Sequence, residues 1–372
     1  MKFRMPLMCV AALLCFGFIG CSAARSRHDP EVVRMAPRPA VSLALQQPDI
    51  VVAVSPVRQT MQIGGSIPTL LGAGISAVQD NSYAVRVRQA LGDYDPCAVL
   101  LEKMKAQIAE GFVQEVTQVA PQGTAAGFAN MREARKARLG GLQYNGYDIL
   151  LDLDLSFGIY GPQGILAVKA KGELFDVQKG RLLWRNEVVS YSVDLFADVR
   201  WRDPMQRMTP NITAPRFSVE GDAISRWVPD GGAPLRAGLE AAVDNVASAL
   251  LADLGLKESA EGLYTLGAYR LLNKKYEAAA ENFRRAVELK PDMQDAVNGM
   301  ALALAKNQQL DEAIALAQKL VEAYPDYMPG HYNLAWWYAT EKKDAERACT
   351  HYEKALELGV SPSNRMKRKM KQ

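Results

Sequence analysis

The clearest alternation of apolar and polar positions lies between residues 147 and 191. Apolar residues take every second place from Ile149 to Phe157, and Asp152, Asp154 and Ser156 alternate with them from residue 151 onward. A period of two is typical of a half-buried strand. Two similar segments follow, 165–176 and 181–191, and turns containing glycine separate them. The pattern predicts a three-stranded antiparallel meander, and a β-branched segment at 49–57 predicts one more strand.

Apolar residues three or four positions apart predict helices around these strands. The expected helices span residues 67–91, 96–119 and 235–254. The first overlaps an uncharged stretch, 63–78, which either packs under the sheet or contacts a membrane or a neighbouring subunit. Together these elements predict a small antiparallel-sheet α/β domain over residues 49–255.

A second pattern begins near residue 260 and repeats every 34 residues. Gly267, Ala301 and Ala335 are 34 apart, and so are Pro291 and Pro325. This spacing of small residues and prolines resembles tetratricopeptide (TPR) repeats. The resemblance implies an all-α solenoid of about three repeats over residues 260–362, so the fold class expected for the whole chain is α+β.

The repeats depart from the family pattern in three places. Arg270 stands where the family prefers tyrosine, Ala317 replaces the usual aromatic residue, and the third repeat has one extra residue near 342–344. One of Trp336 and Trp337 is expected to serve packing alone. The resemblance also implies that a protein or peptide binds along the face of the first helices. Carrying over the family's groove positions gives Tyr264, Asn298, Lys306, Tyr332 and Trp336.

The N-terminus carries a short apolar run that ends at Cys21. Lys2 and Arg4 precede residues 5–19, which are too few to span a bilayer as a mature helix. The sequence up to Cys21 resembles the lipobox of bacterial lipoprotein signal peptides. The resemblance implies removal of residues 1–20 and acylation of Cys21 with fatty acids such as palmitate. An ordinary cleaved signal and an uncleaved anchor are the alternatives.

The position after the lipobox cysteine bears on location. It holds Ser22 rather than aspartate, and by family resemblance this implies an outer membrane protein that faces the periplasm. Residues 21–48 mix proline, alanine, arginine and serine without a sustained period, which predicts a flexible tether. A tether of this length reaches about 30 Å.

The hairpin segment from Gly172 to Trp184 suggests a second function. Asp176, Gly180, Leu182 and Trp184 occupy places that resemble those in the α/β domain of the curli-secretion lipoprotein family. This resemblance implies an oligomeric component of an envelope secretion or export assembly, formed through the α/β domain. The leading hypothesis is a membrane-anchored scaffold that binds an envelope protein through its repeats.

Charge and candidate chemistry argue against other function classes. The net charge is only +3, so the chain lacks the positive excess typical of nucleic-acid binding proteins, and we expect no nucleic-acid partner. Asp152 and Asp154 invite a metal or acid–base interpretation, but ion pairs with Lys169 and Lys171 on the next strand are favoured. The sequence has no set of nucleophile and base, no metal-ligand spacing and no phosphate loop. We therefore expect no enzyme activity, metal or cofactor.

Two cysteines, a loop and the C-terminus complete the predictions. Cys97 and Cys349 are expected to be unpaired buried thiols rather than a disulfide. The loop at 195–234 combines aromatic residues with arginine, and it forms either a contact surface or a packed cover. The basic tail, 363–372, either binds anionic lipid or polymer or is a solvated, frayed end.

Overall fold

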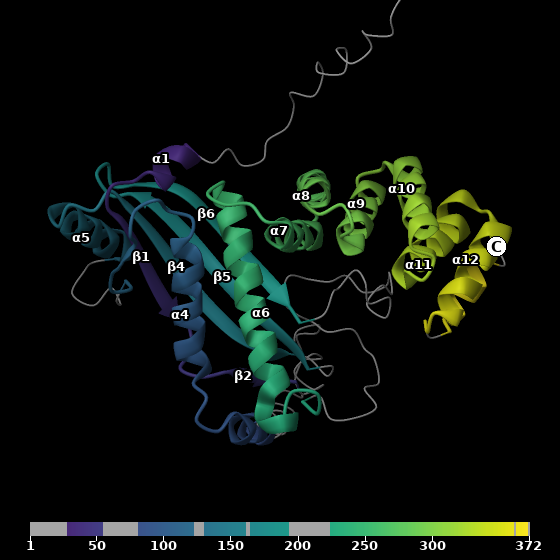
Figure 1. Ribbon diagram of the computed structural model, residues 1–372, viewed down its shortest axis with the longest axis horizontal. Helices are drawn as coiled ribbons and strands as arrows, with labels where there is room; N and C mark the ends of the chain where they lie inside the picture. The colour runs from purple at the N-terminus through teal and green to yellow at the C-terminus, as the bar shows by residue number, and fades with distance from the viewer. Residues whose placement is uncertain are drawn as a thin grey trace, which may run out of the picture.

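The computed structural model describes residues 28–54, 81–122, 130–160, 164–192, 224–360 and 362–370. A sheet with helices on its faces occupies one end of the molecule, and a row of helices continues from it (Figure 1). This arrangement confirms the predicted α+β class. The N-terminal residues, the uncharged stretch at 63–78 and most of the loop at 195–234 lie outside the described residues, and the predictions made for them remain predictions.

The sheet is mixed rather than wholly antiparallel. Its six strands run in the order β3-β1-β4-β5-β6, with β2 paired to β4. The predicted meander is confirmed, because β5 pairs antiparallel with both β4 and β6. Three shorter strands add parallel pairings, β1 and β2 with β4, and β3 with β1. The bounds are β1 Pro39–Leu45, β2 Val51–Ala53, β3 Thr117–Gln118, β4 Ile149–Tyr160, β5 Ile165–Asp176 and β6 Arg181–Tyr191.

The prediction of a flexible tether to residue 48 was wrong from residue 28 onward. A short helix, α1, spans Pro30–Arg34, and the carboxylate of Asp29 caps it by accepting a hydrogen bond from the amide of Glu31 at 3.0 Å. The strand β1 follows and lies between β3 and β4, with Ala40 and Val41 completely buried. A strand covered on both faces need not alternate between apolar and polar residues. This is why β1 shows no period of two.

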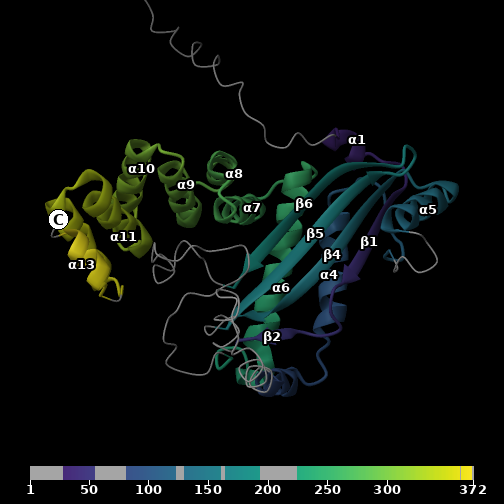
Figure 2. The same ribbon diagram turned by 180° about the vertical axis from the view of Figure 1, so that it is seen from behind.

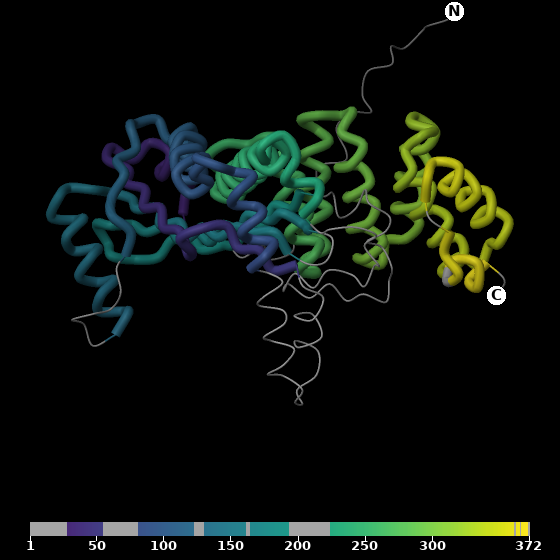
Figure 3. Tube along the Cα trace, turned by 90° about the horizontal axis from the view of Figure 1, so that it is seen from below, coloured from purple at the N-terminus to yellow at the C-terminus, as the bar shows by residue number. Residues whose placement is uncertain are grey.

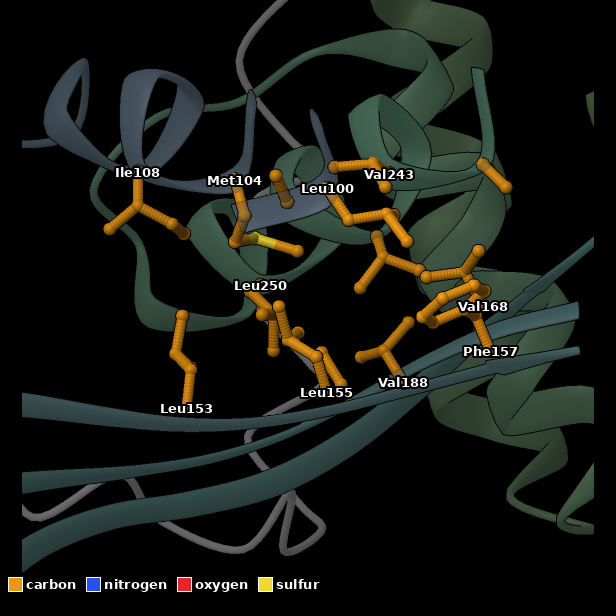
Figure 4. Packing of buried hydrophobic residues seen from close by; sticks show 14 of the residues in the cluster. Leu100, Met104, Ile108, Leu153, Leu155, Phe157, Val168, Val188, Val243 and Leu250 are labelled. Atoms are coloured by element: carbon orange, nitrogen blue, oxygen red, sulfur yellow. The ribbon is translucent and has the colours of Figure 1, made fainter. Parts of the chain in front are cut away.

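Two long helices cover one face of the sheet. They are α4, Pro96–Ala109, and α6, Pro229–Leu254, and residues 81–91 form a further helix beside them. Figure 4 shows side chains of α4 and α6 meeting those of the sheet. The helix α4 ends before the predicted residue 119, because the chain turns at Gly111 and residues 117–118 join the sheet. The labelled residues of this core are Leu100, Met104, Ile108, Leu153, Leu155, Phe157, Val168, Val188, Val243 and Leu250.

A helix that the sequence did not predict, α5 at Met131–Tyr144, covers part of the opposite face. It is rich in charge and buries only a narrow apolar stripe, so its periodicity is weak. Its Arg138 binds Asp152 of β4 at 2.6 Å. On the next strand Lys169 pairs with Glu187 of β6 at 2.8 Å. The expected ion pairing between Asp152 and a lysine of β5 was therefore wrong, because the helix supplies the cation.

The repeat helices form three pairs that follow the α/β domain in a row (Figure 3). A small residue at each crossing lets the helices approach closely. At Gly267 an added Cβ would lie only 2.9 Å from the ring of Phe283. The six helices are α7 Ala260–Leu272, α8 Tyr276–Leu289, α9 Gln294–Lys306, α10 Leu310–Ala323, α11 Met328–Trp337 and α12 Ala345–Glu357.

The basic tail is not a frayed end over its described part. Residues Asn364–Met370 form a further helix, α13, which lies beside the last pair (Figure 2). Met366 is completely buried, and the amide of Ser363 donates to the hydroxyl of Tyr352 at 2.6 Å. A solenoid needs its terminal apolar face covered. The tail supplies that cover, although the sequence showed no capping helix.

Candidate protein-binding surface

The repeats are stacked directly on a helix of the α/β domain. One side of α6 presents Val243 and Leu250 to the core beneath the sheet. Its other side faces α7, where a Cβ on Gly262 would lie 2.6 Å from the carbonyl oxygen of Ser248. Ala252 of α6 also belongs to a buried cluster with Leu263 of α7. The helix α6 is thus the first layer of the solenoid.

Asp253, near the end of α6, holds the two domains together. Its carboxylate accepts hydrogen bonds from the indole of Trp184 at 2.8 Å and from the amide of Asn186 at 2.7 Å, both on β6. It also pairs with Arg270 of α7, which donates a further hydrogen bond to Asn282 at 2.8 Å. Arg270 is the residue that departs from the repeat pattern. Its role is to bind the α/β domain.

A second contact joins α7 to the same strand. The phenol of Tyr269 is hydrogen-bonded to the carboxylate of Glu187, and burial followed by that negative charge raises its pKa to about 12. Burial likewise raises the pKa of Tyr191 to about 12, with Tyr269 as a smaller cause. Both phenols are therefore neutral at physiological pH. The first repeat is fixed on the sheet by an ion pair and by hydrogen bonds from neutral donors to carboxylates.

The five predicted groove residues lie on the first helices of the three repeats, α7, α9 and α11, but they differ in burial. Asn298 is completely buried and accepts a hydrogen bond from the amide of Asn333 at 2.7 Å. Tyr332 is only 7% exposed and meets Tyr352 edge-on, with 6.5 Å between ring centres. These two side chains hold the solenoid together, so they offer little surface to a partner.

The other three predicted residues reach the surface to different extents. Lys306 is exposed, while Tyr264 and Trp336 are half-buried. The ring of Tyr264 lies 5.6 Å from that of Phe283, so part of it packs. Trp337 is 6% exposed, which makes it the packing member of the tryptophan pair, as expected. Of the five predicted residues, one tryptophan, one tyrosine and one lysine are therefore presented at the first-helix face.

The extra residue of the third repeat is absorbed by a π-helix. This single wide turn, η2, spans Tyr338–Lys342 and continues α11. Lys343 follows in the left-handed conformation, with φ of 57°, and the amide of Asp344 returns to the carbonyl of Tyr338 at 3.0 Å. Wide turns of this kind accommodate one inserted residue within a helix. The helix α12 then begins with the normal repeat geometry.

Sequence reasoning missed a pair of histidines in the third repeat. Nδ1 of His331 lies 3.1 Å from Nδ1 of His351, and Nε2 of His331 lies 3.0 Å from the carbonyl oxygen of Pro325. Since a carbonyl only accepts, His331 carries its proton on Nε2 and accepts from His351 at Nδ1. The ring of Tyr338 stacks on His351, with 6.0 Å between ring centres. The two histidines are 20 positions apart in the sequence, and no known motif has that spacing, so the sequence carried no signal for the pair.

Both imidazoles are held in the neutral form. Burial, and then the neighbouring His331, lower the pKa of His351 to about 4. The pKa of His331 is also lowered, first by burial. Among the described residues no group of three or more histidine, cysteine or acidic side chains is placed to hold a metal ion. This pair is a hydrogen-bonded element of the third repeat.

The two cysteines are unpaired, as predicted. Cys97 and Cys349 are free and half-buried rather than fully buried. Cys97 donates to the carbonyl of Pro48 at 3.4 Å, and Cys349 lies 3.8 Å from the sulfur of Met370. In the described part of the 195–234 loop, Trp227 is 7% exposed and its indole donates to the carbonyl of Gly164 at 2.6 Å. That part of the loop packs as a cover.

Comparison with known proteins identifies the repeats. Residues 264–328 and 298–360 match the family model described as tetratricopeptide repeat. No curated protein sequence matches the chain. Among the described residues, no helix combines the length and apolar character needed to cross a bilayer. The repeat match indicates a role in protein–protein interaction for this part of the chain.

Proposed function

We propose that this protein is a non-enzymatic, lipid-anchored protein of the cell envelope that recruits a protein partner through its repeats. The lipobox-like segment ending at Cys21 supports the anchor and a location at the outer membrane, facing the periplasm. Cys21 lies outside the described residues. The observation that carries the recruiting role is the packing of the three repeats on α6, which joins the first-helix face to the α/β domain.

The partner binds the first-helix face at its half-buried and exposed positions. Trp336 and Tyr264 supply aromatic surface, and Lys306 supplies a positive charge at the end of α9. Aromatic side chains with one cation suit an extended peptide that carries apolar and acidic residues. Asn298 and Tyr332 support this face from below.

A pull-down of the lipidated protein from its own envelope tests the groove. The informative variant is Trp336→Ala with Lys306→Glu, because substitution of the buried Tyr332 would also damage the fold. Lys319→Glu is the control, since Lys319 is also exposed but lies on α10, the second helix of its repeat. We expect partners to be lost only in the first variant. If the same partners are still captured by the first variant, the α/β domain rather than the repeats binds them.

The anchor is tested separately by labelling cells with radioactive palmitate. We expect incorporation into the natural protein and none into Cys21→Ala, which should also leave the membrane fraction. Equal labelling, or an unlabelled natural protein that still remains with the membrane, would contradict a lipid on Cys21.

The alternative proposal is an oligomeric component of an envelope secretion or export assembly. It is supported by the β5–β6 hairpin, in which Gly180 turns with φ of 60° and the carboxylate of Asp176 accepts from the amide of Lys179 at 2.9 Å. These are positions that resemble the curli-secretion lipoprotein family. Sedimentation of the lipidated protein in detergent distinguishes the two proposals. A concentration-independent monomer would contradict the assembly.

A further inference from the structure

The folded chain begins much closer to Cys21 than a long tether would allow. His28 is already in place, with its Nε2 3.0 Å from the carbonyl oxygen of Leu254 at the end of α6. Only six residues, 22–27, separate it from Cys21. Seven Cα–Cα steps span at most about 25 Å. A lipid on Cys21 therefore confines one end of the α/β domain to the neighbourhood of the bilayer.

That end, here called the entry end, is formed by several segments from different parts of the chain. The helix α1 lies against the end of α6, where a Cβ on Gly255 would meet the ring of Pro30 at 2.8 Å. The amide of Val113, after α4, donates to the carbonyl of Arg34 at 3.0 Å. The amide of Arg38 donates to Asp148, in the turn between α5 and β4, at 3.0 Å. Figure 1 shows α1 at this end of the sheet.

Exposed apolar side chains gather at the entry end. Val32 is 66% exposed, and Met35 and Val113 are each 51% exposed. Tyr144, at the end of α5, is 92% exposed. Among the described residues these are four of the seven large apolar side chains that are exposed. Exposed apolar residues that cluster in this way mark interaction surfaces more often than single ones do.

The charges of the entry end are largely paired with one another. Arg34 pairs with Glu31 at 3.8 Å, and Lys257 pairs with Glu110. Lys179 pairs with Asp176 at 3.3 Å in the β5–β6 turn. This end therefore has no strong excess of either sign, and contact with lipid would depend on apolar side chains more than on anionic head groups.

We infer that the entry end rests on the lipid surface, with Val32, Met35 and Val113 in the interface between head groups and acyl chains. The inference rests on the proposed acylation of Cys21, since the short linker brings this end to the bilayer. The occupant is the membrane itself rather than a protein, because the lipid attached to Cys21 holds the bilayer within reach of the patch. The lipid and the apolar patch then fix the orientation of the molecule together.

Site-specific fluorescence in vesicles tests the orientation. The full-length lipidated protein, with Cys97→Ser and Cys349→Ser, receives a single cysteine as Met35→Cys, Val113→Cys or Leu289→Cys. Each is labelled with an environment-sensitive dye and reconstituted into vesicles of phosphatidylethanolamine and phosphatidylglycerol that contain a nitroxide lipid. Leu289 is the control because it is 54% exposed and lies on α8.

We expect the dye at positions 35 and 113 to be quenched about twofold by interfacial contact, and the dye at 289 to be unaffected. Equal fluorescence at all three positions, in protein that floats with the vesicles, would overturn the orientation while leaving the lipid anchor intact. Protein that fails to float would contradict acylation of Cys21, and this orientation with it.

Discussion

The α/β domain and the repeats are held together in opposite ways. In the α/β domain, strands far apart in the sequence pair with each other, as Pro39 does with Ile149, and a single large core joins them. In the repeats each helix packs mainly against its neighbours in sequence, and small residues set the spacing. A domain of the first kind unfolds as a unit, whereas a solenoid loses stability pair by pair.

The difference teaches that the repeats depend on a neighbour that they do not supply. The solenoid would present an uncovered apolar face at α7, and α6 covers it from the α/β domain. At the far end α13 does the same for the third repeat. The repeats are therefore stable as part of the whole chain, and their first pair shares its stability with the sheet.

Phe283→Ala should cause the largest loss of stability, and most of it should fall on the repeats. The ring is completely buried between α7 and α9, where a Cβ on Gly267 or Gly299 would lie within 2.9 Å of it. Removing it leaves a cavity that costs roughly 3–5 kcal/mol of unfolding free energy. Urea unfolding followed by circular dichroism measures this loss. Leu289→Ala on the same helix is the control, and a matching loss in the α/β domain would contradict the separation.

Asp253→Ala should weaken both regions together. It removes the acceptor shared by Trp184, Asn186 and Arg270 and leaves these donors without it at the junction. We expect a loss of about 2–3 kcal/mol, detected in urea by both tryptophan fluorescence and circular dichroism. Combining it with Arg270→Ala should add less than the sum of the two single losses. Full additivity would show that the pair does not couple the domains.

Acidification should destabilise the third repeat while sparing the α/β domain. Histidine in the unfolded chain has a pKa near 6.5, and burial lowers that of His351 to about 4 in the folded repeat. The unfolded state therefore binds more protons below pH 6.5, and stability falls as the pH drops from there towards 4. Asp326, Lys354 and Tyr338 also face the pair.

The loss for the histidine pair should be about 2 kcal/mol after allowance for its partial exposure. Thermal unfolding at a series of pH values measures it, and His351→Gln should flatten the slope between pH 6.5 and 4. A slope that persists in this variant would assign the effect to other groups.

Ser259→Ala should have the smallest effect, at the boundary between the two regions. The hydroxyl of Ser259 caps α7 by accepting from the amide of Gly262 at 3.1 Å. Its loss should cost about 1 kcal/mol, which chemical denaturation resolves when Ser259→Thr serves as the control. The threonine variant retains the cap and should be close to the natural protein. An equal loss in both variants would show that packing against α6, rather than capping, is disturbed.

The sequence predicted features that depend on local pattern. The meander was predictable because β4, β5 and β6 follow each other and keep one face on the core. The repeats were predictable because the 34-residue pattern occurs three times in the sequence. In contrast β1 and α5 were not predicted. One is covered on both faces, and the other buries little beyond Ala134 and Leu139, so neither shows the periodicity that identifies an element.

The predicted groove positions were only partly informative, because the sequence pattern does not show which of them are buried. Family positions locate Tyr332 and Asn298 on the correct helices, but their burial depends on Tyr352 and Asn333, which belong to the packing of this particular array. The histidine pair and the hydrogen bonds of Asp253 join residues 17 or more positions apart. Pairings of this kind cannot be recognised from the sequence and are found only in the three-dimensional structure. Arg270 carried a signal nonetheless, because it departed from the repeat pattern where it binds the other domain.

Because α6 packs on both the sheet and the repeats, its number of residues determines the direction in which the repeats point relative to the sheet. A helix advances about 1.5 Å and turns about 100° with each residue. One residue inserted between Val243, which faces the core, and Ala252, which faces the repeats, would rotate the whole array by about 100° around the axis of α6. Insertions of seven or eleven residues would nearly restore the phase while moving the repeats farther along the axis. The length of α6 between these two contacts therefore sets the orientation of the first-helix face relative to the sheet.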